Sequence, residues 1–201
     1  ILLTAVVSCF LLLTLREAPK WMDSRRLWTS VLSRDPDNPV ALFGLGFDEL
    51  RAGDPGMARE LLVRAARIDP GYPKLAVCLG RASQILAGRS AAGTRENLVL
   101  LQEAQSAFHQ AVRLWQAGAR DDRELFRFAL FHAGGLAMDI GRPDIARQHL
   151  ELYLSTPGPA VGGEQAAARL DELAARFEHT GDAGLVAGLR AAAVAAREGG
   201  P

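Results

Sequence analysis

An uncharged apolar run, ILLTAVVSCFLLLTL, occupies Ile1 to Leu15. A helix of that length spans roughly 22 Å at ~1.5 Å per residue, whereas the hydrocarbon core of a bilayer is about 30 Å thick. We therefore expect residues 1–18 to be the C-terminal part of a transmembrane helix that begins upstream. A secretory signal sequence is the alternative, although the run lacks a basic segment and LREAPKW is a poor cleavage site. A buried soluble helix would be apolar on one stripe rather than on every face.

Past this run, apolar positions recur at the spacing of amphipathic helices, and prolines and glycines interrupt them. Pro36 in SRDPDNP and Pro70 in RIDPGYP lie 34 residues apart, and each ends an apolar-periodic stretch. A Leu-Gly pair ending at Gly46 recurs with its glycine at Gly80. Self-similarity at this period predicts an all-α chain built of stacked helix pairs.

The period and these positions resemble the tetratricopeptide repeat (TPR). With Pro39 as the first position of a repeat, Gly46 and Ala58 fall where the two helices of a hairpin cross, so a larger side chain would push the backbones apart. The resemblance implies a solenoid of helical hairpins with a concave face lined by the first helix of each pair. The residues that define the repeat are Leu45, Gly46, Ala58, Leu62, Ala65, Pro70, Leu79, Gly80, Ala104, Phe108, Ala111, Gly134 and Ala146.

The register breaks once. Matches to the second helix of the second unit come 12 residues late, which predicts an insertion at about 89–100 with a helix start capped by Thr94 and a longer second helix. The expected divisions after the membrane segment are a linker with a partial repeat helix (19–38), a repeat (39–72), a repeat with the insertion (73–122), a TPR-like repeat (123–160) and a degenerate capping helix pair (161–201).

By resemblance to the family, a partner protein or peptide would contact the first helices along the concave face. Aromatic residues at Phe43 and Phe47 argue against the grip on a C-terminal carboxylate that other TPR proteins achieve with lysine and asparagine there. An apolar groove favours a helix or an extended segment as ligand. Internal packing of the phenylalanines is the alternative. The candidate residues are Phe43, Phe47, Arg51, Lys74, Val77, Arg81, Gln84, Phe128, Phe131, Met138 and Asp139.

Charge and chemistry narrow the function further. Lys+Arg and Asp+Glu both number 23, so the chain lacks the basic footprint of a nucleic-acid binder. Cys9 and Cys78 have no neighbours at metal-ligand spacing, and the four histidines lie on different predicted helices without i+3 or i+4 partners. The sequence has no G-x-S-x-G elbow and no phosphate-binding loop. We therefore predict no metal, no cofactor and no catalytic residue in this chain.

The junction REAPKWMDSRRLWTSVLSRDPDNP resembles that of polytopic membrane glycosyltransferases with TPR tails, the transmembrane O-mannosyltransferases. The residues that carry this likeness are Trp21, Leu27, Trp28, Pro36 and Asn38.

Two functions follow from the sequence: a membrane-tethered interaction module, or the accessory TPR domain of such a glycosyltransferase, whose catalytic part would then lie upstream. Arginine greatly outnumbers lysine and alanine is abundant, which suggests a bacterial source with a GC-rich genome and hence the bacterial inner membrane. Basic residues after the apolar run favour a cytoplasmic array. The glycosyltransferase resemblance favours a periplasmic one, which we prefer.

Overall fold

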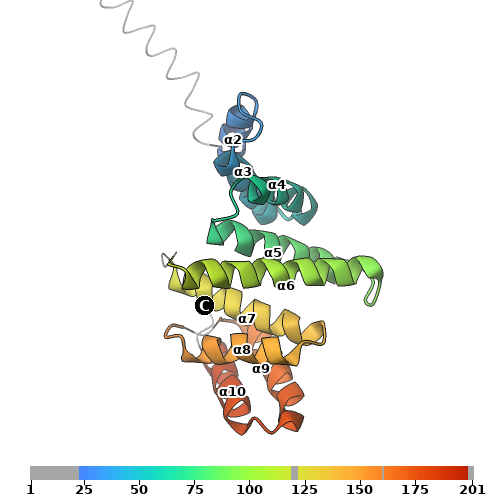
Figure 1. Ribbon diagram of the computed structural model, residues 1–201, viewed down its shortest axis with the longest axis vertical. Coiled ribbons are helices and arrows are strands. Elements are labelled where there is room, and N and C mark those ends of the chain that lie inside the picture. The colour runs from blue at the N-terminus through green and yellow to red at the C-terminus, as the bar shows by residue number, and fades with distance from the viewer. Residues whose placement is uncertain (1–22, 119–121, 160, 199–201) are drawn as a thin grey trace, which may run out of the picture. The chain divides into compact units, whose positions relative to one another are not determined.

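The computed structural model describes residues 23–118, 122–159 and 161–198, and every regular element among them is a helix. The helices follow one another as hairpins, which confirms the predicted all-α fold of the TPR type (Figure 1). Their bounds are α2 (Ser24–Leu32), α3 (Pro39–Ala52), α4 (Pro55–Ile68), α5 (Pro73–Arg89), α6 (Arg95–Gln116), α7 (Arg123–Asp139), α8 (Pro143–Ser155), α9 (Glu164–Phe177), the 3-10 turn η1 (Glu178–Thr180) and α10 (Ala183–Glu198).

The chain divides into two compact units, one up to Pro70 and one from Gly71. The described part of the first unit holds α2 and the hairpin α3–α4, and the second unit holds the hairpins α5–α6, α7–α8 and α9–α10. In the second unit one continuous cluster of buried apolar residues runs from Ala76 to Ala196.

Helix starts are encoded locally. Four helices, α3, α4, α5 and α8, begin with proline, whose fixed φ suits the first helical position and whose missing N–H would have no partner there. Side-chain oxygens also cap helix starts: Asp54 accepts from the Met57 amide of α4 at 3.0 Å, and Asp122 accepts from the Leu125 amide of α7 at 3.0 Å.

The hairpin crossings require small residues at the repeat positions. A Cβ added to Gly46 would lie 2.9 Å from Leu62 Cγ and 3.3 Å from the Ala58 carbonyl oxygen. The same contact occurs in the hairpin α7–α8, where a Cβ at Gly134 would lie 2.7 Å from Leu150 Cγ. These distances explain why the sequence repeats glycine at this position.

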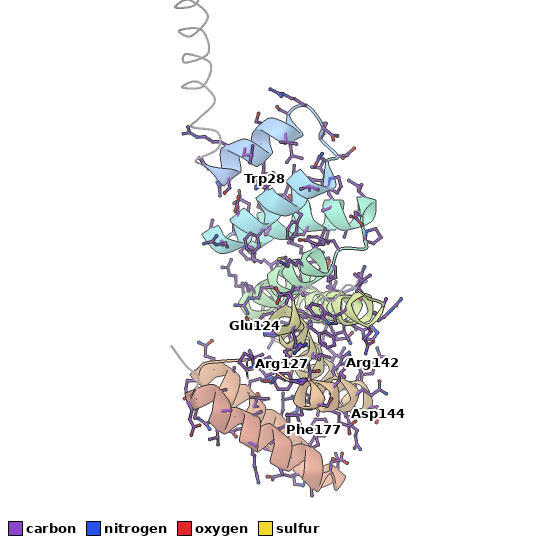
Figure 2. All side chains as sticks on the ribbon, turned by 90° about the vertical axis from the view of Figure 1, so that its left-hand side faces the viewer. Trp28, Glu124, Arg127, Arg142, Asp144 and Phe177 are labelled. Atoms are coloured by element: carbon purple, nitrogen blue, oxygen red, sulfur yellow. The ribbon has the colours of Figure 1, made fainter. Side chains whose placement is uncertain are left out.

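α2 packs on α3. Trp28 lies on α2 in the first unit (Figure 2), and a Cβ added to Gly44 of α3 would lie 2.3 Å from its indole ring. Arg25 donates to Glu49 Oε2 at 2.7 Å across the same pair of helices. The tryptophan and the glycine therefore fit each other.

The predicted insertion at 89–100 is mostly helical. α5 continues to Arg89, the connecting loop is short, and α6 begins at Arg95 and reaches 22 residues. Thr94 caps α6 as expected, accepting from the Asn97 amide at 3.2 Å. The extra turns also pack, because Asn97 Nδ2 donates to the buried Ala87 carbonyl at 2.7 Å and Leu100 is 7% exposed.

The expected membrane helix, residues 1–18, lies outside the described residues. Within residues 23–118, 122–159 and 161–198, no helix is both long enough and apolar enough to cross a bilayer.

Candidate peptide-binding groove

The first helices of three successive hairpins line a pocket of about 610 Å³ in the second unit. α5, α7 and α9 each contribute side chains, and the connector between α8 and α9 adds Val161 and Gly162 to the lining. We call this pocket the groove. Its lining residues are Arg81, Gln84, Ile85, Phe128, Phe131, His132, Gly135, Leu136, Asp139, Val161, Gly162, Gln165, Ala166 and Arg169.

One wall of the groove is aromatic and comes from α7. Phe128 and Phe131 flank His132, with ring centroids 4.2 and 5.0 Å from the imidazole. Behind them, the fully buried Phe108 of α6 stacks on the imidazole at 5.3 Å. Residues three and four apart on a helix share a face, so α7 brings these rings together by its own geometry.

His132 is neutral at physiological pH. Burial, together with the nearby guanidinium groups of Arg81 and Arg169, lowers the pKa of His132 from 6.5 to about 3. Desolvation and neighbouring cations both disfavour the imidazolium. The groove therefore presents an uncharged imidazole that can donate one hydrogen bond and accept another.

Two arginines of the groove differ in whether a carboxylate neutralises their charge. Arg169 donates to Asp139 Oδ2 at 2.6 Å, to Glu172 Oε2 at 2.6 Å and to the Gly135 carbonyl at 2.9 Å, and Arg176 donates to Asp139 Oδ1 at 2.9 Å. The bonds to Asp139 and Gly135 tie α9 to α7. Arg81 instead lies over the Phe128 ring at 5.7 Å, and no carboxylate pairs with it among the described residues.

Arg127 fixes the connector between α8 and α9, which lines part of the groove. Its side chain, shown in Figure 2, is 6% exposed and donates to the carbonyl oxygens of Tyr153 at 2.8 Å, Pro159 at 2.9 Å and Thr156. The phenol oxygen of Tyr153 accepts from the Val161 amide at 3.1 Å. These bonds hold Val161 where it can contact a ligand.

Five of the candidates from the sequence line the groove: Arg81, Gln84, Phe128, Phe131 and Asp139. Phe131 is 4% exposed and contributes mainly to packing. Lys74, at the start of α5, pairs with Asp122 at 3.9 Å and does not line the groove.

Val77 and Met138 differ from the expectation. They are 5% and 7% exposed and belong to the buried core cluster. Each side chain lies among the apolar residues of the core, so neither is available to a partner.

The remaining three candidates lie on α3 of the first unit. Phe43 and Phe47 stack with ring centroids 6.2 Å apart, and the Arg51 guanidinium lies 5.9 Å from the Phe47 centroid. Phe47 is 40% exposed. These residues form a separate aromatic strip on α3.

Solved structures share this architecture. Two structures of MamA superpose with a TM-score of 0.62 at 20% sequence identity; one alignment covers 89% of this chain and 90% of that chain, the other 91% and 86%. TTC0263, described as a thermophilic TPR protein in Thermus thermophilus, has a TM-score of 0.53 at 20% identity, with 93% of this chain and 88% of that chain covered. The chain has the tetratricopeptide-repeat fold. No protein-family model matches the sequence, and neither does any curated protein.

Several residues that line the groove were not predicted from the sequence. His132, Gln165 and Arg169 were not candidates, because the histidine falls between the expected contact positions and α9 belongs to the poorly matching last unit. One signal was available: His132 follows Phe128 by four positions, which places the imidazole on the same face of α7 as that ring.

Proposed function

We propose that this chain is a protein-interaction module whose groove binds a peptide segment of a partner protein. The observation that carries this proposal is the groove itself: a pocket of about 610 Å³ on the first helices of three hairpins, with an aromatic wall and Arg81 unpaired among the described residues. The proposal assigns no reaction to the chain.

The side chains of the groove favour a particular ligand chemistry. Phe128 and Val161 offer apolar contacts, which suit a bulky apolar side chain as an anchor. Arg81 suits a carboxylate, because its charge is not already neutralised by an ion pair as that of Arg169 is. Neutral His132, together with Gln84 and Gln165, can bond the peptide backbone. We therefore expect an apolar residue close to an acidic one.

Selection from a random peptide library on the full chain tests this proposal. Enriched peptides should carry an apolar residue within a few positions of Asp or Glu. Their affinity should fall roughly tenfold in Arg81→Gln, about the 1.4 kcal/mol of one charge-assisted contact. Phe128→Ala should weaken binding as well.

Arg89→Gln is the matched control, because it removes the same charge from the same helix at an exposed position outside the groove. If Arg81→Gln and Arg89→Gln lost the same peptide affinity, the effect would come from long-range charge rather than from a direct contact of Arg81. Enrichment that survives Phe128→Ala but is lost in Phe47→Ala would instead assign binding to the aromatic strip of α3.

Membrane tethering, a periplasmic location in a bacterial inner membrane and the accessory role in a glycosyltransferase remain predictions of the sequence. Tethering and location depend on residues 1–18, which lie outside the described residues. The glycosyltransferase role depends on Trp21, also outside them, and on the resemblance at Leu27, Trp28, Pro36 and Asn38. Fractionation of cells that express the chain with and without residues 1–18 tests the first of them.

A further inference from the structure

Two histidines from different hairpins meet away from the groove. His109 lies on α6 and His149 on α8, and the distance from His109 Nδ1 to His149 Nε2 is 3.1 Å. The two rings are perpendicular, with centroids 5.2 Å apart. His149 is 5% exposed, whereas His109 is exposed to solvent. The pair is thus a buried imidazole covered by an accessible one.

The neighbouring backbone fixes the tautomer of His149. Its Nδ1 lies 2.8 Å from the Ile145 carbonyl oxygen, which can only accept, so Nδ1 carries the hydrogen. In the neutral ring, Nε2 then keeps its lone pair and directs it toward His109. A histidine whose second nitrogen donates to a carbonyl is the usual arrangement of a metal ligand.

We propose that His109 Nδ1 and His149 Nε2 form a two-histidine site for a borderline transition-metal ion, Zn²⁺, Ni²⁺ or Cu²⁺, that bridges α6 and α8. With metal–nitrogen bonds of ~2.0–2.1 Å, two ligand nitrogens lie about 2.9 Å apart at a right angle and about 3.3 Å apart at the tetrahedral angle. The observed 3.1 Å falls between these values.

The protonation state of the two histidines favours metal binding. Burial lowers the pKa of both histidines below 6.5, so both rings are neutral at pH 7. On binding, the ion replaces the hydrogen bond between the two nitrogens and lies to one side of the line that joins them, so both rings turn to direct their lone pairs at it. The His109 proton moves through solvent from Nδ1 to the other ring nitrogen, so no net proton is released.

Two features limit the affinity. Arg113 lies near enough to lower the pKa of His109, and its charge also opposes a cation. Within the described residues, no group of three or more His, Cys, Asp or Glu side chains could hold a metal ion, so water would complete the coordination shell. The site is open, unlike a closed structural zinc site.

Zinc titration of the full chain at pH 7.5, followed by calorimetry, tests the proposal. We expect one Zn²⁺ per chain with an affinity at least tenfold lower in His109→Gln. His179→Gln, an exposed histidine elsewhere, should bind as the wild type does. Cu²⁺ should show electron paramagnetic resonance hyperfine coupling to two imidazole nitrogens in the wild type and to one in His109→Gln.

His109→Gln is the decisive variant, because the residue is exposed and the change should leave the fold intact. Circular dichroism checks this. Wild-type zinc affinity in His109→Gln, or no binding by the wild type at millimolar zinc, overturns the proposal. A copper spectrum with a single nitrogen in the wild type does so too.

Discussion

Gly80 has no Cβ, and this allows α5 and α6 to approach each other closely. A Cβ there would lie 2.9 Å from two ring carbons of Phe108, which is fully buried and cannot move aside. We expect Gly80→Ala to destabilise the protein by about 1–3 kcal/mol through overpacking, measured by urea unfolding.

Gly88 provides the control on the same helix. An added Cβ at Gly88 meets nothing within 4 Å, so Gly88→Ala should be neutral or should stabilise by up to about 1 kcal/mol through helix propensity. If both alanines had the same effect, the close approach at Gly80 would not limit the packing.

His132 should make stability depend on pH. Its folded pKa of about 3 lies below the unfolded value of 6.5, so between these values the unfolded chain binds the additional proton. Stability is therefore fully present above pH 6.5 and falls as the pH drops toward 3, by at most about 1.4 kcal/mol per pH unit.

His132→Phe keeps a ring at this position and removes the titration. Urea unfolding between pH 6.5 and 4.5 should show a shallower loss of stability in this variant than in the wild type. His179→Gln, at an exposed position, is the control. An unchanged slope in His132→Phe would mean that the imidazole is hydrated in the folded protein.

At the scale of elements, the connector between α8 and α9 depends on one buried arginine. Arg127 donates to three carbonyl oxygens near the C-terminal end of α8, and no carboxylate pairs with it among the described residues. The partial negative charge of the helix C-terminus favours a cation there.

Arg127→Met should leave these carbonyls without their donor and destabilise the protein by about 1–3 kcal/mol. Amide hydrogen exchange over residues 156–163 should accelerate more than that of α5. Arg123→Met, an exposed change on the same helix, should do neither. Unchanged exchange in Arg127→Met would show that the Tyr153 phenol alone holds the connector.

Elements were predictable where a local rule specifies them. The glycine at each crossing and the residues that start helices follow from the sequence, because a close approach or an orphan amide accepts few residue types. The insertion was only partly predictable: the register gave its length, but the packing of Asn97 on Ala87 depends on α5 extending to Arg89.

The groove depends on features that a repeat pattern does not encode. Val77 and Arg81 lie one turn apart on α5, yet one is buried in the core and the other lines the groove. That difference depends on the neighbouring helices. α9, whose sequence matches the repeat poorly, supplies Arg169 and Gln165. The contact between His109 and His149 likewise joins residues 40 positions apart.

At the scale of the whole molecule, the groove belongs to the second unit alone. Its lining residues run from Arg81 to Arg169, and the core cluster beneath them runs from Ala76 to Ala196. Three helical pairs bury this core, which is about the number of repeats that a solenoid needs for independent stability. The described part of the first unit has three short helices. Short helices have marginal stability in isolation.

A fragment of residues 71–201 should therefore fold without the first unit and keep the groove. Amide exchange of α7 and α9 in the fragment should agree with that of the full chain within about threefold, and a peptide selected on the full chain should bind with similar affinity. A fragment of residues 23–70 should show weak, uncooperative helicity by circular dichroism. Loss of cooperative unfolding in the longer fragment would mean that the second unit depends on the first for its stability. The aromatic strip of α3 and the groove would then belong to one cooperative array.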